Sequence, residues 1–170
     1  HGVLYDGWEF QRTMREMLSR ETATLRVLHI IFTNRLLGTW EEYDLRYHLR
    51  TIILGSPALI STSGLVEAPA RPREFYLALQ VLGSVASDDS RYLAMKRQFG
   101  NRFLEHDDER LTGVAKGYAL QAVAYQFAGE AFCTDCACQL FNAHWQEEML
   151  SAQSGARPCT RHEELLGQLR

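Results

Sequence analysis

The chain has 170 residues, of which 46% are hydrophobic and 23% are charged, and its formal net charge at pH 7 is −3. This composition is typical of an ordinary globular protein that can bury a sizeable core. The acidic balance argues against a nucleic-acid partner, which needs a basic surface. No apolar run approaches the roughly 18 residues that a membrane span requires.

The N-terminal third is expected to contain most of the strands. Apolar residues with helical spacing predict a helix over residues 8–20. The β-rich run over residues 25–32 predicts a buried strand, and the stretch 33–43, which carries Asn34, Gly38 and charged residues, is expected to be a loop. Two more strands are predicted over 47–54 and 58–62, the second ending in a turn at Ser63-Gly64.

The rest of the chain has the features of helices. A proline-rich turn precedes a predicted helix over 73–82. Residues 87–102 are expected to form a short helix and a loop, and the longest helix is predicted over 108–128. Two helices, over 142–152 and 161–169, complete the chain. Because the strands come early and the helices late, the expected fold class is α+β, with helices on one side of a small mixed sheet.

The four cysteines are confined to the C-terminal part of the chain. Three of them stand close together in Cys133-Thr-Asp-Cys136-Ala-Cys138, and the fourth belongs to Cys159-Thr-Arg-His162. Two close thiols, a helical spacer and a second pair can close a tetrahedral zinc shell of thiolates and one imidazole. Zinc is preferred to an iron–sulfur cluster because one ligand is a histidine and no long four-cysteine run is present.

The expected ligands are Cys133, Cys138, Cys159 and His162. Cys136 is an alternative, because Cys133-x-x-Cys136 is itself a common zinc-binding spacing. A disulfide is a further interpretation, but clustered thiols and the lack of a secretory signal favour a reducing, cytoplasmic compartment. A zinc shell with all four positions filled would be structural, because it folds the C-terminal part of the chain and leaves no position for a substrate.

The residues around this cluster resemble the archaemetzincins, a metzincin-like branch of zinc peptidases with the signature H-E-x-x-H-x-x-G-x-x-H-C-x-x-x-x-C-x-M and a later C-x-x-C. Cys133 and Cys138 fall on its two cysteines, Gly129 falls on its glycine, and Cys159-x-x-His162 falls on the final pair. The similarity covers about residues 25–162 and is strongest in the cysteine-rich loop.

The catalytic part of that signature is not retained. Ala122, Gln126 and Phe132 stand at its three histidine positions, Val123 at the glutamate and Leu140 at the methionine. Alanine and phenylalanine cannot bind a metal, and valine cannot take a proton from a metal-bound water. The resemblance therefore implies a peptidase fold with a degenerate catalytic site.

Other residues could have taken over the lost chemistry. The candidates are His48 in a predicted strand, the acidic cluster Glu105-His-Asp-Asp-Glu109, and the pair His144 and Glu148 spaced i, i+4 on a predicted helix. Each has a structural interpretation as well: a satisfied strand histidine, acidic residues that cap the long helix and complement its dipole, and an ion pair or cap.

The resemblance implies a single metzincin-like domain over residues 1–170. Its sheet and central long helix would span about 25–128, and a zinc-stapled helical lobe would span 129–170. We expect a pseudo-peptidase whose cleft binds a peptide or protein partner, with structural zinc as the cofactor, and we expect neither nucleic acid nor membrane as a partner. The alternative is a zinc-dependent hydrolase that uses the substitute groups. The oligomeric state stays open.

Overall fold

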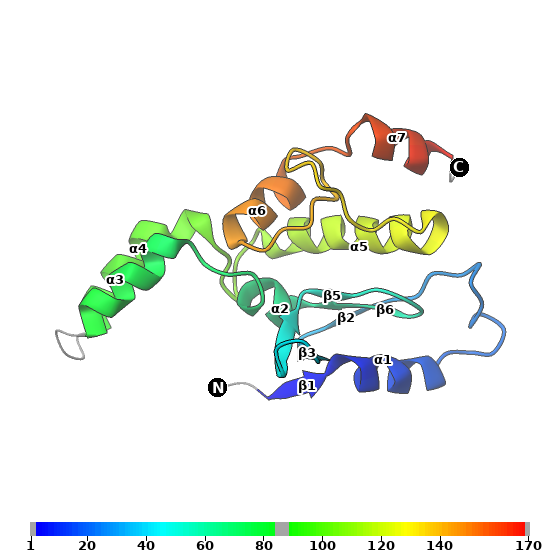
Figure 1. The fold of residues 1–170 in the computed structure, drawn as a ribbon, viewed down its shortest axis with the longest axis horizontal. Coiled ribbons are helices and arrows are strands. Elements are labelled where there is room, and N and C mark those ends of the chain that lie inside the picture. Colours follow the sequence, from blue (N-terminus) through cyan, green and yellow to red (C-terminus); the bar gives the residue numbers. More distant parts are fainter. Residues whose placement is uncertain (1–2, 84–88, 169–170) are drawn as a thin grey trace.

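A computed structural model describes residues 3–83 and 89–168 and has an α+β fold. Strands occupy the N-terminal part of the chain and helices the C-terminal part, which confirms the expected fold class (Figure 1). The elements in chain order are β1 (Leu4–Asp6), α1 (Gly7–Glu16), β2 (Ile30–Thr33), β3 (Leu36–Glu41), β4 (Arg46–Arg50), β5 (Ile52–Ile53), β6 (Ala58–Ser61), α2 (Thr62–Glu67), α3 (Arg73–Gly83), α4 (Asp89–Phe99), the 3₁₀ helix η1 (Gly100–Arg102), α5 (Leu111–Ala128), α6 (Gln146–Ser154) and α7 (Thr160–Gly167).

The strands form two small mixed sheets. In the first, with order β1-β3-β4, β1 is parallel to β3 and β4 is antiparallel to it. In the second, with order β2-β6-β5, β2 is parallel to β6 and β5 is antiparallel to it. The chain passes from the first sheet to the second at Thr51, between β4 and β5. The small mixed sheet of the prediction is therefore divided in two.

Helices cover both faces of the second sheet, whereas they were predicted on one side only. Helix α5 runs along one face and α1 lies on the other, while α6 and α7 stack over α5 (Figure 1). Helices α3 and α4 form a hairpin that extends to the side. No helix in the described part of the chain is long and apolar enough to cross a membrane.

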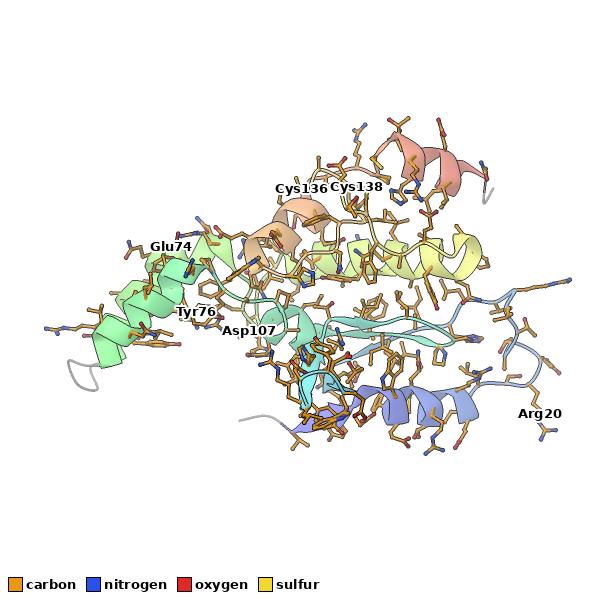
Figure 2. All side chains as sticks on the ribbon, viewed as in Figure 1. Arg20, Glu74, Tyr76, Asp107, Cys136 and Cys138 are labelled. Carbon is orange, nitrogen blue, oxygen red and sulfur yellow. The ribbon has the colours of Figure 1, made fainter. Side chains whose placement is uncertain are left out.

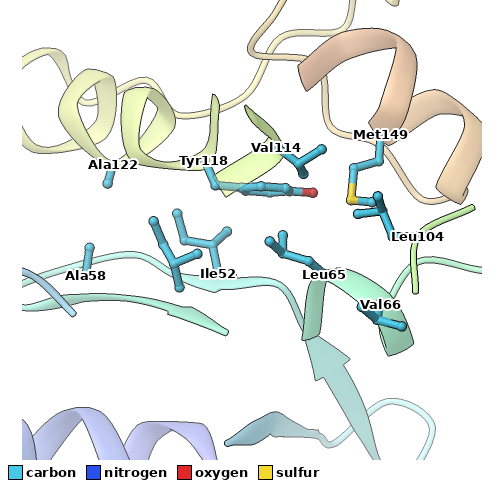
Figure 3. Close-up of a cluster of buried hydrophobic side chains, with 10 residues drawn as sticks. Ile52, Ala58, Leu65, Val66, Leu104, Val114, Tyr118, Ala122 and Met149 are labelled. Carbon is cyan, nitrogen blue, oxygen red and sulfur yellow. The ribbon is translucent and has the colours of Figure 1, made fainter. Parts of the chain in front are cut away.

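The main core lies between the second sheet and α5. Ile52 and Leu65 face Val114 and Tyr118 of α5 and Met149 of α6 (Figure 3). Because successive strand residues point to opposite faces, the neighbours of the inward residues supply a second core.

That second core consists of Leu37, Ile53 and Leu59, which are buried beneath α1. The sheet is thus buried on both sides, which accounts for its almost continuous apolar strands. A third cluster holds the α3–α4 hairpin together through Phe75, Met95, Phe99 and Phe103.

The predictions for the first two strands and the loop between them need correction, and the strand predicted over 47–54 is divided into β4 and β5, which belong to different sheets. Strand β2 covers only Ile30–Thr33, and Leu25, expected at the start of a buried strand, is 78% exposed. The segment expected to be a loop contains β3, the central strand of the first sheet. The partner strands β1 and β4 come before and after β3 in the chain. Whether this segment forms a strand therefore depends on pairing with them rather than on local composition.

The turn predicted at Ser63-Gly64 is the start of helix α2. The Ser61 side chain caps the helix by accepting the Gly64 N–H at 2.7 Å. A Cβ atom at Gly64 would overlap the carbonyl oxygen of Arg50. The glycine therefore allows α2 to approach β4 closely and does not end the preceding strand as a loop residue.

Six helices were predicted and the described residues contain seven, because α2 was predicted as a turn, and the predicted helices differ from the observed ones at their ends. Helix α3 matches its prediction within a residue, and the long helix begins at Leu111 rather than at residue 108. Helix α6 begins at Gln146, four residues after the expected start. Parts of two predictions, residues 87–88 and residue 169, lie outside the described residues.

Candidate metal centre and the cavity beside helix α5

The cysteine-rich loop starts from the C-terminus of α5. Gly129 ends the helix with φ 74°, a left-handed conformation that glycine adopts without a steric penalty. Its N–H donates to the carbonyl of Tyr125 at 2.9 Å. Further on, the Cys133 N–H donates to the carbonyl of Leu140 at 2.7 Å, which closes the loop on itself.

The second pair of metal-binding side chains comes from the start of α7. Cys159 is the N-cap residue of this helix and His162 lies in its first turn. The Gln139 N–H donates to the carbonyl of Arg157 at 3.0 Å, so the chain before α7 is hydrogen-bonded directly to the cysteine-rich loop. Figure 2 shows this loop, with Cys136 and Cys138 labelled, above α5.

The side chains of Cys133, Cys138, Cys159 and His162 form a cluster whose ligand atoms all lie within 4.8 Å of one another. Nδ1 of His162 is 3.1 Å from Cys159 Sγ and 3.5 Å from Cys138 Sγ. A tetrahedral zinc ion with Zn–S bonds of about 2.3 Å and Zn–N bonds of about 2.0–2.1 Å separates its ligand atoms by about 3.6–3.8 Å. The observed separations, from 3.1 Å to at most 4.8 Å, lie on both sides of these values, so the four side chains could hold such an ion.

Cys136 is exposed and does not belong to the cluster. Backbone N–H groups donate to the sulfurs of Cys133 and Cys138, which do belong to it. The Asp135 N–H donates to Cys133 Sγ at 3.4 Å, and the Leu140 and Cys159 N–H groups donate to Cys138 Sγ at 3.4 and 3.3 Å. Such donors stabilise thiolates, the form in which cysteine binds metals.

The pKa values of Cys138 and Cys159 are shifted in opposite directions. Burial raises the pKa of Cys138 to about 11, because Cys138 is fully enclosed. The backbone N–H and the ring of His162 lower the pKa of Cys159 to about 7. A buried thiolate at Cys138 needs a compensating positive charge, and a bound cation would supply it.

The residues that the resemblance matches to catalytic ligands have other surroundings. Ala122 is buried in the core against the sheet. The Gln126 side chain donates its amide to the carbonyl of Leu25 at 2.7 Å. Phe132 is 45% exposed and lines a cavity beside α5.

This cavity has a volume of about 140 Å³ and lies between the β4–β5 segment and α5. Its walls combine apolar side chains with polar groups that are uncharged apart from Arg50 and His144, and they contain no carboxylate. The lining residues are Leu49, Arg50, Thr51, Ile52, Ala68, Pro69, Tyr118, Gln121, Phe132, Phe141, Asn142, Ala143 and His144.

Two of the cavity residues, Tyr118 and Gln121, were missed in the sequence. Gln121 is fully buried, its amide lies 3.4 Å from the carbonyl of Phe141, and its Oε1 has no partner among the described residues. Burial raises the pKa of Tyr118 to about 12. A glutamine between the apolar residues Leu120 and Ala122 of the long helix was the available signal.

His48 and His144, the two histidines that were candidates for a substitute catalytic site, have different neighbours. Nε2 of His48 lies 2.7 Å from Asp44 Oδ2, and the ring packs against Tyr43. His144 lines the cavity. Glu148, its expected partner, instead accepts the backbone N–H groups of His144 and Trp145 at 3.0 and 3.1 Å. Glu148 thus caps α6, and the i, i+4 pair does not form on a helix face, because α6 starts after His144.

Three members of the acidic cluster before α5, Glu105, His106 and Asp108, lie in ion pairs. Glu105 binds Lys96 at 2.7 Å, and Asp108 binds Arg110 at 2.6 Å, which lowers the pKa of the aspartate chiefly through the side-chain hydrogen bond. His106 lies 3.2 Å from Glu67. The expected capping role is wrong, since the N-cap residue of α5 is Arg110 and no side chain caps the helix.

Fold and cluster define an α+β protein with a Cys₃His site that could bind a metal such as zinc. The chain belongs to a family described as "Probable metallopeptidase family (DUF6775)", whose model matches residues 1–169. No curated protein and no solved structure matches it. Membership confirms the expected link to metallopeptidases at the level of the family.

Proposed function

We propose that this chain is a pseudo-peptidase, a non-catalytic member of its family with a structural zinc site and a peptide-binding cavity. The observation that carries the proposal is the position of the metal-capable side chains. Within residues 3–83 and 89–168, they gather in the Cys133, Cys138, Cys159 and His162 cluster, whereas the cavity beside α5 is lined by aromatic and uncharged groups apart from Arg50 and His144.

The zinc in this proposal is structural. Four protein ligands fill a tetrahedral shell and leave no position for a water or a substrate. Two of the ligands, Cys138 and His162, are fully buried, and the cluster joins the loop after α5 to the start of α7. Zinc bound there would stabilise the fold of the C-terminal lobe, residues 129–168.

The lack of a catalytic centre rests on the archaemetzincin resemblance together with the side-chain contacts. If α5 corresponds to the zinc-binding helix of those peptidases, Ala122 and Gln126 stand where two histidines would bind the metal. Ala122 packs into the core, and the Gln126 amide is hydrogen-bonded to Leu25. Neither is available as a ligand.

The size and charge of the cavity favour one uncharged side chain of an extended peptide. Its volume of about 140 Å³ is close to the roughly 150 Å³ of an engineered cavity that binds benzene. Arg50 is already paired with Glu41 and donates to Thr39 at 2.7 Å, so its charge is compensated. Strand β5 stands at the edge of its sheet, where an extended peptide could pair with the backbone.

Two phenylalanines provide a matched test. Phe132 lines the cavity and is 45% exposed, while Phe127 on α5 does not line it and is 44% exposed. We would measure fluorescence anisotropy with labelled alanine hexapeptides that carry one varied central residue. Peptides with an apolar or aromatic central residue should bind best, and Phe132→Ala should weaken binding at least about tenfold while Phe127→Ala leaves it unchanged. Absence of binding to the wild type would contradict the proposal.

The hydrolase alternative retains one supporting observation, which is that His144 lines the cavity. A single imidazole is too few protein ligands for a catalytic zinc, which uses three. The pseudo-peptidase proposal predicts no cleavage of casein or of the hexapeptides by zinc-loaded protein. Cleavage that disappears in His144→Ala would establish the alternative instead.

A further inference from the structure

Glu130 lies between the end of α5 and the metal cluster. It directly follows the helix-ending Gly129, and its backbone N–H donates to the carbonyl of Ala124 at 3.4 Å. Its carboxylate oxygen Oε2 is 3.6 Å from Nε2 of His162 and is hydrogen-bonded to the guanidinium of Arg161. The turn at the end of α5 thus places a carboxylate against the side of His162 that faces away from the sulfurs.

The His162 ring has one nitrogen whose partner is unexplained. Nδ1 faces the sulfurs of Cys138 and Cys159, whereas Nε2 is buried and has no hydrogen-bond partner among the described residues. A neutral imidazole that binds a metal through one nitrogen carries its proton on the other. With Nδ1 at the metal, the proton is on Nε2 and needs an acceptor.

Glu130 is the acceptor within reach. The 3.6 Å separation between Nε2 and Oε2 exceeds a direct hydrogen bond of about 2.7–3.2 Å, but a water bridging two such bonds would need roughly 4.5 Å. A shift of less than about 1 Å in the Glu130 side chain, which is 35% exposed, makes the direct hydrogen bond.

We infer that Glu130 is a positioning residue for the metal centre: its carboxylate accepts the Nε2–H of His162 and so directs Nδ1 toward the ion. A hydrogen bond of this kind fixes the tautomer and orientation of a metal-binding histidine and increases its basicity. Arg161 offsets the added negative charge, because its guanidinium binds the same carboxylate and interacts electrostatically with Cys133 and Cys159.

The test is zinc affinity of the full chain, measured by competition with a chromophoric chelator. Glu130→Ala should weaken zinc binding about 10- to 100-fold. Glu163→Ala is the matched control, because Glu163 is an exposed acid in the first turn of α7 that changes the same charge close to the cluster. It should leave the affinity within about twofold, since it lacks contact with the His162 ring.

A second comparison separates positioning from general stability. In a His162→Cys background the fourth ligand is a thiolate, which has no ring N–H for Glu130 to accept. Glu130→Ala should then have no effect on zinc affinity. ¹⁵N NMR of the zinc-loaded protein should show Nε2 of His162 protonated and Nδ1 bound to metal. If Glu130→Ala does not fold, Glu130→Gln keeps an acceptor and should retain affinity within about threefold of the wild type.

Three results would overturn the inference. They are unchanged affinity in Glu130→Ala, an equal loss from Glu130→Ala in the His162→Cys background, and a metal bound to Nε2. None of these measurements involves peptide, so they stand or fall independently of the proposed peptide binding.

Discussion

Gly117 of α5 and Gln153 of α6 are in direct contact, with the glutamine side chain occupying the space that a Cβ atom at Gly117 would need. Gln153 is only 3% exposed. This contact allows the two helices to pack closely above the sheet (Figure 1). It also distinguishes the two glycines of α5, because Gly113 is exposed and has no atom within 4 Å of its hypothetical Cβ.

Alanine substitutions at these glycines should have opposite effects. Gly117→Ala should destabilise the protein by about 1–3 kcal/mol, because the new methyl group overlaps the buried Gln153 side chain. Gly113→Ala should stabilise it by up to about 1 kcal/mol, because alanine favours the helix at an open position. Urea unfolding of both variants measures the free energies. Equal effects at the two positions would contradict the helix–helix contact.

Substitutions of the two buried glutamines of α6 should change the stability of the protein by different amounts. Gln146 accepts the Leu104 N–H at 3.1 Å and donates to the carbonyls of Leu65 and Val66 at 2.8 and 2.9 Å. The amide atoms of Gln153 have no partner among the described residues. Gln146→Met should therefore cost at least about 2 kcal/mol, because three buried backbone groups lose their partner, whereas Gln153→Met should change the free energy of unfolding by less than about 1 kcal/mol.

Thermal and urea unfolding of the two glutamine variants provide the measurement. The side-chain volumes are similar in both substitutions, so packing changes should be comparable and the hydrogen bonds should account for the difference. A Gln153→Met variant as unstable as Gln146→Met would show that Gln153 has partners, such as enclosed water, that its protein contacts do not supply.

Alkaline pH should destabilise the protein through Tyr118. Burial raises the pKa of this phenol from 10.0 to about 12, so its neutral form is favoured in the folded state. The contribution of Tyr118 to the free energy of unfolding is fully present below pH 10. It is lost as the pH rises through 10 to 12, because in this range the phenol ionises readily only in the unfolded chain. Two pKa units correspond to at most about 3 kcal/mol.

The measurement is urea unfolding between pH 8 and 12. Tyr118→Phe should lose less stability than the wild type over this range, by up to about 3 kcal/mol, because the phenylalanine does not titrate. Tyr125→Phe is the control, since Tyr125 lies on the same helix and is 41% exposed. It should follow the wild-type curve. Parallel curves for all three proteins would refute the role of Tyr118.

Removing single thiols should separate the metal ligands from the bystander. Cys138→Ser should abolish stoichiometric zinc and lower the melting temperature, because the fully buried Cys138 is a member of the cluster. Cys136→Ser should keep one zinc per chain, because Cys136 is exposed and outside the cluster. Plasma mass spectrometry on untagged protein gives the metal content, and zinc loss in Cys136→Ser would assign that thiol to the site instead.

Some features of this protein depend on local sequence and were predictable from it. The C-terminal cysteine and histidine pairs come from short segments, where spacing alone limits how far the ligand atoms can separate. Helix α3 follows a proline-rich turn, and α5 is a long apolar segment ended by Gly129. For these elements the information that determines the structure lies within a few turns of the residue concerned.

Tertiary structure decided the rest. Strand β3 is a strand because β1 and β4 pair with it, and its short local sequence, which includes Gly38, does not reveal partners that are distant in the chain. The choice between Cys136 and Cys138 depends on how the loop closes between Cys133 and Leu140. The contact between Glu130 and His162 joins the ends of two helices that are separated by α6, and only their packing brings the carboxylate to the imidazole.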